Sequence, residues 1–303
     1  MSDQLNKYLF ADQSTRVQHV KLDQTWQAGL QHQAYPECIQ NLLGELLAAA
    51  TLLAGNLKFD GSFILQIQGD GPIALLVVEC NSEMQVRATI SLREGQEIPA
   101  DGNLQSLLNA SGNGRCVVIL MPDQKNGDFA PYQGIVPLEG DTVAEILEAY
   151  MRNSEQLDTR LWLSADANRC AGLLLQRLPG QGGNQQLSDT LETWERGLSL
   201  ASTITHDELL ELEAEQLIHR LFWQENLTSY EPQEVNWHCP CSRERVADML
   251  KMLGSAEIED ILTTQDLVHV ACNFCGKPYE FDAIDCAALF IEPEHLPSSN
   301  TLH

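Results

Sequence analysis

Apolar residues alternate with polar ones in several short stretches of the segment 1–180. Phe63 to Gln68 follows this strand pattern, and the turn Gly69-Asp-Gly-Pro72 separates it from a more continuously apolar run, Ile73 to Glu79. Two such runs joined by a glycine-containing turn predict a β-hairpin. Because the turn has no following Lys-Ser or Lys-Thr, it does not indicate a phosphate-binding loop. Further strand patterns are found at 84–90, 115–121, 161–164 and 170–178.

Two stretches of the same region instead show helical spacing. Residues 37–54 place their large apolar side chains on one face, and residues 142–153 predict a second helix with Asp141 as its N-cap. Helices therefore interrupt the strands. We expect residues 1–180 to form a mixed α/β core domain with a substantial β-sheet. The apolar positions of the first helix are Ile39, Leu42, Leu43, Leu46 and Leu47.

A glycine- and glutamine-rich segment, 179–186, interrupts the patterning and predicts a flexible connection. Leu187, Leu191, Trp194 and Leu198 then recur at helical spacing, and a further helical stretch starts at Thr205 and continues or restarts up to 222. Helices this short and acidic need a surface on which to lay their apolar side chains. We expect 181–235 to be an acidic helical linker that is folded only while it is docked.

The remaining residues predict a small domain at 236–290, followed by a disordered tail at 291–303. Within the small domain, 242–253 and 256–262 have helical patterns and 267–271 has a strand pattern. The predicted fold class is α+β: a mixed α/β core, a helical linker and a small C-terminal domain, in which two close pairs of cysteines predict zinc binding.

The net negative charge of the chain excludes some classes of binding partner. The chain of 303 residues has a net charge of −25, and 181–235 alone contains 2 basic and 11 acidic side chains. Such a chain is repelled by nucleic acid and by anionic lipid surfaces, because affinity for both depends on Lys and Arg. No stretch approaches the roughly 18 uninterrupted apolar residues of a membrane span, and the N-terminus lacks a signal-peptide pattern. We therefore expect a cytoplasmic protein, in which nine cysteines do not form a disulfide framework.

Four of these cysteines lie in two close pairs near the C-terminus. Cys239-Pro-Cys241 is followed, after thirty residues, by Cys272-Asn-Phe-Cys275-Gly276. Two such pairs can converge on one tetrahedral site of four thiolates, the ligand set that zinc favours. The first pair is tighter than the usual spacing of two to four residues. Four unrelated buried thiols would explain the pattern poorly, but a purely structural zinc site remains an alternative.

The size of this unit favours a role for metal loss. A unit of roughly 55 residues with few large apolar groups has a core that barely sustains folding, and zinc contributes on the order of 10 kcal/mol to the folding of such units. Zinc-bound sulfurs are thiolates, the form that reacts with oxidants. Oxidation of both pairs would remove every ligand, unfold the unit and loosen the preceding helices, which would expose apolar surface.

The string His238-Cys-Pro-Cys-Ser-Arg-Glu-Arg245, together with the Cys272-x-x-Cys275-Gly276 motif, resembles the redox-regulated heat-shock chaperone family whose members are called thirty-three-kilodalton chaperonins. The resemblance extends over the rest of the chain, where similar core-domain motifs are 58–61, 68–72, 132–134, 138–141 and 154–157.

This resemblance implies a holdase chaperone of the bacterial cytosol that needs no ATP and is not an enzyme. Its reduced form would hold one zinc ion per chain through Cys239, Cys241, Cys272 and Cys275 and would be inactive. Oxidation would form the disulfides Cys239–Cys241 and Cys272–Cys275 and release zinc. The oxidised protein would dimerise and hold unfolding client proteins.

The other candidate residues have simpler explanations. Cys286 fits a helix-packing position, although it could exchange with nearby disulfides, and His238 and His269 are possible substitute ligands that four thiols make unnecessary. Two rival functions remain: a dithiol-disulfide oxidoreductase, disfavoured because Gly-Lys-Pro rather than a helix follows Cys275, and a nucleic-acid-binding zinc module, disfavoured by charge. Small buried hydrophobic positions are expected for Cys38, Cys80, Cys116 and Cys170.

Overall fold

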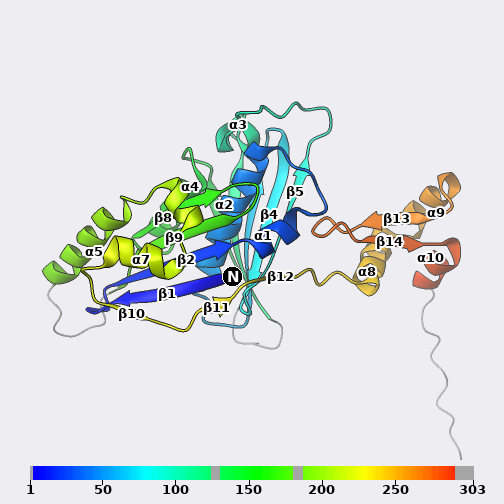
Figure 1. Cartoon of the computed structure of the whole chain (residues 1–303). Coiled ribbons are helices and arrows are strands. Elements are labelled where there is room, and N and C mark those ends of the chain that lie inside the picture. Colours follow the sequence, from blue (N-terminus) through cyan, green and yellow to red (C-terminus); the bar gives the residue numbers. More distant parts are fainter. Residues whose placement is uncertain (1–2, 124–129, 180–186, 291–303) are drawn as a thin grey trace, which may run out of the picture. The chain divides into compact units, whose positions relative to one another are not determined.

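The computed structural model describes residues 3–123, 130–179 and 187–290 (Figure 1). Contacts within the chain divide it into two units, Met1–His238 and Cys239–His303. The predicted α+β fold class is confirmed, whereas the predicted domain boundaries at 180, 235 and 290 stay predictions. The predicted flexible connection, from residue 180 onward, and the predicted tail lie outside the described residues.

The first sheet of unit 1 has the strand order β10-β1-β2-β9-β8, and β11 also pairs with β1. All of these pairings are antiparallel. The strands β1 and β2, at the N-terminal end of unit 1, are not predicted by the sequence pattern. The described strands of this sheet are β1 (Gln4–Phe10), β2 (Thr15–Leu22), β8 (Thr159–Ala165), β9 (Cys170–Arg177), β10 (Leu227–Ser229) and β11 (Gln233–Glu234).

The second sheet has the order β12-β5-β4-β3-β6-β7. The predicted hairpin is confirmed as β3 and β4, whose turn is closed by a hydrogen bond from the Gly69 amide to the Ala74 carbonyl (3.0 Å). The strand β7 is not predicted by the sequence pattern. The strands are β3 (Gly61–Gln68), β4 (Ile73–Asn81), β5 (Gln85–Leu92), β6 (Arg115–Pro122), β7 (Tyr132–Pro137) and β12 (Asn236–Trp237).

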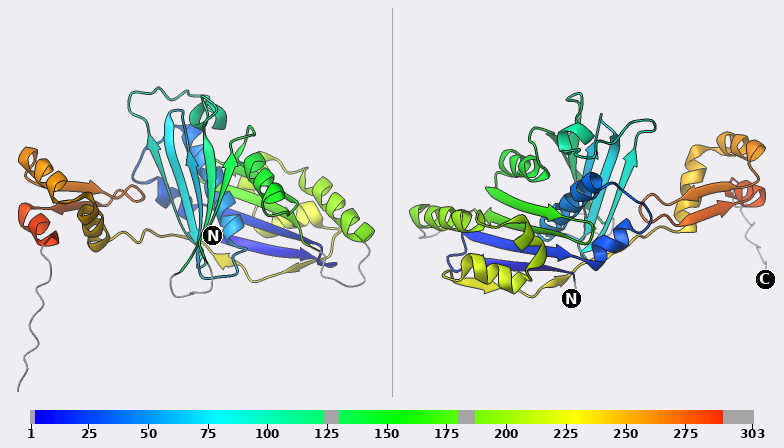
Figure 2. Two further views of the ribbon diagram at one scale, coloured as in Figure 1. Left: turned by 180° about the vertical axis from the view of Figure 1, so that it is seen from behind. Right: turned by 45° about the horizontal axis from the view of Figure 1, so that its top comes forward.

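The predicted long helix is α2 (Glu37–Ala54), and it packs between the two sheets (Figures 1 and 2). Gly44 allows its close approach to β8, because a Cβ atom at this position would lie 2.5 Å from the Cβ of Ala165. Among the described helices, α2 is long and apolar enough to cross a membrane, but 72% of it is buried inside the protein. It is therefore the core helix of unit 1. Three other helices flank the sheets: α1 (Gln24–Leu30), α3 (Leu104–Leu108) and α4 (Val143–Asn153). Thr142, not the predicted Asp141, caps α4.

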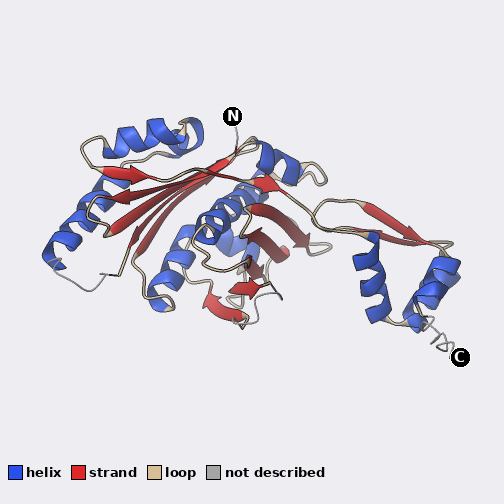
Figure 3. Ribbon diagram, turned by 90° about the horizontal axis from the view of Figure 1, so that it is seen from below, coloured by secondary structure: helices blue, strands red, loops and turns tan. Residues whose placement is uncertain are grey.

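Three helices from the predicted linker pack against the opposite face of the first sheet, so that this sheet has helices on both faces (Figure 3). They are α5 (Leu187–Ala201), α6 (His206–Glu211) and α7 (Ala214–Phe222). The helix α6 begins directly after Thr205, where the sequence pattern starts this helical stretch, and the Thr205 side chain caps it by accepting a hydrogen bond from the Glu208 amide. Trp194 is buried in this interface, whereas Leu191 is 41% exposed, so the prediction that Leu191 belongs to the apolar face is wrong.

The part of unit 2 that the structure describes, up to residue 290, contains three helices and a two-stranded antiparallel sheet. The two predicted helices and the strand after them are confirmed, and β14 and α10 are additional. Its small apolar core consists of Leu250, Ile258, Val268, Tyr279, Phe281 and Cys286. The elements are α8 (Arg243–Leu253), α9 (Ser255–Thr264), β13 (Val268–Ala271), β14 (Pro278–Phe281) and α10 (Ala283–Leu289).

Candidate metal centre

The two cysteine pairs lie on different elements of unit 2. Cys239 and Cys241 lie in the extended segment that leads into α8, whose first turn is capped by Ser242. Cys272 and Cys275 lie in the turn that joins β13 to β14. This turn is closed by a hydrogen bond from the Gly276 amide to the Cys272 carbonyl (2.8 Å), and Gly276 has a φ of 68°, a conformation that glycine adopts without a steric penalty.

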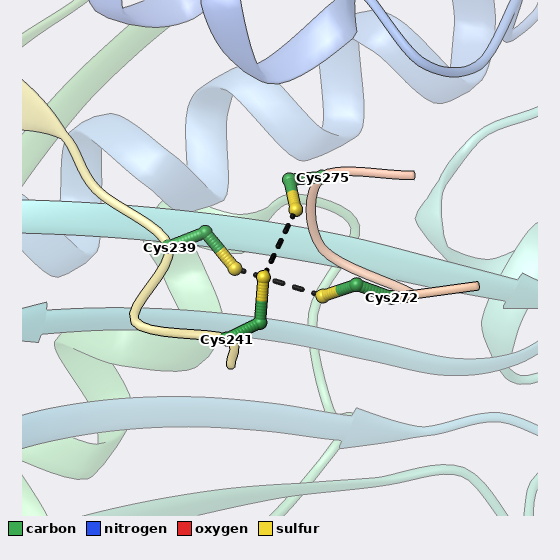
Figure 4. Close-up of side chains that lie close together, drawn as sticks. All are labelled: Cys239, Cys241, Cys272 and Cys275. Atoms are coloured by element: carbon green, nitrogen blue, oxygen red, sulfur yellow. Dashed lines mark hydrogen bonds between the residues drawn. The ribbon is translucent and has the colours of Figure 1, made fainter. Parts of the chain in front are cut away.

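All four sulfur atoms point toward one another and lie within 4.8 Å of each other (Figure 4). The two closest contacts join one pair to the other: Cys239 Sγ to Cys272 Sγ is 3.6 Å, and Cys241 Sγ to Cys275 Sγ is 3.4 Å. Every cysteine is a free thiol, since a disulfide would need about 2.05 Å between sulfurs. A tetrahedral zinc ion with Zn–S bonds of about 2.3 Å separates its sulfur ligands by about 3.8 Å. The cluster therefore has the size and the donor set of a metal centre.

The environment of these thiols is partly apolar. All four are partly buried, and Cys241 and Cys272 contact the small core of unit 2. Burial, with hydrogen bonds from neighbouring thiols, raises the pKa of Cys239 to about 12. At Cys241 burial acts in the same direction, but the adjacent Tyr279 hydroxyl and the other thiols outweigh it and lower the pKa to about 7. The lowered pKa of Cys241 favours its thiolate, the form in which a cysteine binds a metal ion.

The other sequence candidates do not join this cluster in the described residues. His269 is exposed, with its Nδ1 3.4 Å from Glu280 Oε1. Cys286 is buried in the core of unit 2, in agreement with a packing role. Cys80, Cys116 and Cys170 are buried as predicted, whereas Cys38 is only partly buried and its thiol donates a hydrogen bond to the Pro99 carbonyl.

Two residues next to the cluster are not identified by sequence reasoning. Tyr279 contributes its hydroxyl beside Cys241, and no sequence signal distinguishes it from an ordinary strand residue. Arg243 contacts both β14 and α10. It belongs to the Ser-Arg-Glu-Arg string, so a signal for Arg243 exists in the sequence, although nothing there indicates its contacts.

Comparison with known proteins gives one consistent result. A family model described as Hsp33 protein matches residues 3–282. A 33 kDa chaperonin from Methylobacillus flagellatus is 42% identical over 304 residues, covering 100% of this chain and 99% of the relative. A 33 kDa chaperonin from Chromobacterium violaceum is 44% identical over 289 residues, covering 95% of this chain and 94% of the relative. The crystal structure of the 33 kDa chaperonin from Thermotoga maritima has a TM-score of 0.76 at 22% identity, covers 95% of this chain and 97% of its own, and supports the fold. On the family match and these identities, the chain belongs to the Hsp33 protein family, a family of chaperones.

Proposed function

We propose that this chain is a redox-regulated holdase that binds unfolding proteins without ATP, that it is inactive when reduced and zinc-bound, and that oxidation activates it. The observation that carries the proposal is the cluster of four reduced cysteines, Cys239, Cys241, Cys272 and Cys275, in a unit with a very small core. Membership of a chaperone family supports the role in binding unfolded clients. The cysteine cluster supports the regulation.

Zinc is the metal that this donor set fits best, because four thiolates in a near-tetrahedral arrangement favour it over metals that prefer oxygen ligands. When bound, the ion would keep the four sulfurs as thiolates and supply on the order of 10 kcal/mol of folding free energy to unit 2. The side chains of the pairs Cys239/Cys241 and Cys272/Cys275 would hold it, one ion per chain. The apolar core of six buried residues in unit 2 would otherwise be a weak basis for folding.

The oxidation step converts thiols to disulfides. One thiolate attacks hydrogen peroxide, gives a sulfenic acid and releases water after proton transfer; a second thiol then attacks the sulfenic sulfur and expels a second water. Each disulfide thus forms with loss of two protons and two electrons from the cysteines, and one peroxide is reduced to two waters. Two disulfides would consume all four ligands of the centre.

We propose the pairs Cys239–Cys241 and Cys272–Cys275. The closest sulfur contacts run across these pairs, so proximity in the reduced state does not select them. Sequence separation favours them instead, because a partner two or three residues away stays close even when the two segments come apart, whereas a partner more than thirty residues away does not. The proposed pairing therefore requires the two segments to separate during oxidation.

The segment that precedes the cysteines offers a path from unit 2 to the linker. The His238 amide donates a hydrogen bond to the Val86 carbonyl (3.0 Å), and β12 pairs with β5 at Asn236 and Trp237. Cys239 is the next residue along the chain. Once unit 2 has unfolded, β12 would be the last ordered strand before an unfolded segment, and a short strand at such a position unfolds locally at little cost. Loss of β12, and then of β10 and β11, would remove the attachments that follow α7.

Release of α5, α6 and α7 would uncover an apolar face. The interface beneath them contains Phe10, Val17, Leu173 and Leu175 from the sheet, and Trp194, Leu217 and Phe222 among the residues from the helices. An exposed apolar surface of this kind binds unfolded segments of other proteins. We also propose that the oxidised protein forms a homodimer, that it acts in the cytoplasm, and that it has no membrane or nucleic-acid partner and no enzymatic activity. The net charge of −25 supports the absence of the nucleic-acid partner.

A dithiol oxidoreductase is less well supported. Catalytic Cys-x-x-Cys pairs usually lie at the start of a helix, whose N-terminus stabilises the thiolate. Here Cys272 and Cys275 lie in the turn between two strands. Turnover in an insulin-reduction assay would revive this alternative.

The test follows zinc and disulfides together. The reduced, zinc-loaded protein is treated with peroxide at mildly raised temperature in the presence of a chromophoric chelator, and the disulfides are then mapped by peptide mass spectrometry. We expect about one zinc released per chain and the pairs Cys239–Cys241 and Cys272–Cys275. Zinc that stays bound after full oxidation of the thiols would refute the proposal, and a predominance of Cys239–Cys272 and Cys241–Cys275 would refute the proposed pairing.

A further inference from the structure

Arg243, the first residue of α8, makes three contacts with elements that follow the second cysteine pair. Its Nη1 donates a hydrogen bond to the Glu280 carbonyl in β14 (2.6 Å), and its Nη2 bonds Asp285 Oδ2 in the first turn of α10 (2.7 Å). The guanidinium also lies over the ring of Phe281, with 4.1 Å between Cζ and the ring centroid. The guanidinium thus donates two hydrogen bonds through its nitrogens while its planar face stacks on the ring. A lysine ammonium group cannot reproduce this combination.

The position of these contacts along the chain gives them a particular role. Cys241 precedes Arg243 by two residues, so the guanidinium is fixed to the segment that carries the first cysteine pair. Glu280 and Phe281 belong to β14, which is continuous with the turn that carries Cys272 and Cys275. The contacts therefore join the two segments of the cluster independently of the cysteine sulfurs.

We infer that Arg243 is a positioning residue for the metal centre: it holds the Cys239/Cys241 segment against β14 and α10, so that a cysteine pair that has left the metal stays within reach of it. This inference deepens the proposed function and rests on its zinc site. Tethering of this kind acts through effective concentration, because a ligand pair held nearby returns faster than a chelator or an oxidant captures it.

The same contacts would keep one segment of the cluster in place when only the other cysteine pair has reacted. After Cys272 and Cys275 have reacted, Arg243 would still hold the Cys239/Cys241 segment in place. The side chains of Arg243 and Asp285 are 49% and 45% exposed, and exposed ion pairs and cation–π contacts are individually weak and easily broken. Heat or partial unfolding would therefore release the Cys239/Cys241 segment, which makes Arg243 a determinant of the activation threshold.

The experiment measures zinc transfer from the reduced, full-length protein to a chromophoric chelator in the absence of oxidant. Arg243→Gln removes all three contacts, and Arg243→Lys keeps the charge opposite Asp285 but loses the fork. The matched control is Arg245→Gln: this residue is on the same helix, is exposed, and its side chain makes no hydrogen bond or ion pair with any residue that the structure describes. It removes the same charge without the contacts.

We expect Arg243→Gln to transfer zinc about tenfold faster than the wild type, which corresponds to about 1.4 kcal/mol. Arg243→Lys should be intermediate and Arg245→Gln should be within about twofold of the wild type. Because the ion pair is exposed, the effect of Arg243→Gln should shrink in about 1 M salt, where charges are screened within about 3 Å. A loss of packing alone would not show this salt dependence.

Equal transfer rates for Arg243→Gln and Arg245→Gln would overturn the inference, and so would an effect of Arg243→Gln that salt does not reduce. If Arg243→Gln is isolated without zinc, the zinc-transfer rate of Arg243→Lys tests the inference in its place. A rate equal to that of the wild type overturns the inference, and a faster rate that depends on salt supports it. The proposed function fails in a different assay, namely when the reduced, zinc-bound wild type already suppresses aggregation. The two failures are therefore distinguishable.

Discussion

Because His19 on β2 is buried, we predict that a fall in pH weakens the interface between the first sheet and α7. The imidazole is 1% exposed, and neither of its nitrogens has a hydrogen-bond partner among the described residues. It lies on the sheet face that also carries Val17, with Asn6 and Leu173 as its neighbours on the flanking strands. A polar cavity of about 50 Å³ borders it. The charged groups that line this cavity are Asp3, Lys21, Asp23 and Glu213.

The direction of the effect follows from burial. Burial, helped by Lys21 and opposed by Glu213, lowers the pKa of His19 from 6.5 to about 4. In the unfolded chain the imidazole regains water and its ordinary pKa, so the unfolded state binds the extra proton between these values. The stability that neutral His19 preserves is complete above pH 6.5 and is lost as the pH falls toward 4. Between pH 7.5 and 5.5 the loss amounts to about 1.3 kcal/mol, roughly tenfold in the equilibrium constant.

The assay compares the wild type with His19→Gln by urea unfolding at pH 7.5 and 5.5, both above the isoelectric point of about 4.5. Tryptophan fluorescence reports unit 1 alone, because all five tryptophans precede Cys239. The difference between the two proteins is needed, since burial raises the pKa of Glu45 to about 7 and this carboxyl gains stability on acidification. Subtraction cancels that contribution. His219→Gln, at an exposed position of α7, is the matched control.

We expect the stability advantage of the wild type over His19→Gln to fall by about 1.3 kcal/mol between the two pH values, with no such change for His219→Gln. A difference that stays constant within about 0.3 kcal/mol would refute the reasoning. It would mean that His19 reaches water, or a partner, in the folded protein.

Three further predictions concern the linker and the metal centre. Leu217→Ala, at a fully buried position of α7, should cost about 2–5 kcal/mol and raise aggregation suppression by the reduced protein; unchanged suppression despite lost hydrogen-exchange protection in α7 would contradict a role for docking. Chelation of zinc under reducing conditions should abolish exchange protection in α8 and β13 while α2 stays protected, and retained protection in α8 would show that unit 2 folds without metal. Cys286→Ser should keep one zinc per chain and normal activation, whereas zinc loss on this change would assign Cys286 a place in the centre.

Much of the core could be predicted because its patterns are local. The hairpin of β3 and β4 and the core helix α2 each show their periodicity within a short window. The strands β1 and β2 could not be recognised in this way. In β2 both faces are covered, so that Gln18 and His19 are buried beside Val17 and Val20, and a strand with buried polar residues on both faces shows no clear alternation.

The same distinction applies to the metal centre. The convergence of the four cysteines could be predicted because cysteine spacing is itself the chemical signal. The contacts of Arg243 with Glu280 and Asp285, and the position of Tyr279 beside Cys241, depend on the tertiary fold of unit 2. The short strands β10, β11 and β12 pair with β1 and β5, which are distant in sequence, so their attachment to unit 1 also could not be derived from local pattern.

We propose that loss of the metal centre, through oxidation of its four cysteines, turns an inactive protein into a chaperone. The most direct measurement is light scattering from a thermally unfolding client protein in the presence of either the reduced, zinc-bound chain or the peroxide-oxidised, zinc-free chain at equal concentration. We predict that the oxidised chain suppresses aggregation near stoichiometric amounts and that re-reduction with zinc restores the inactive form. Equal suppression by the reduced, zinc-bound chain would contradict the account.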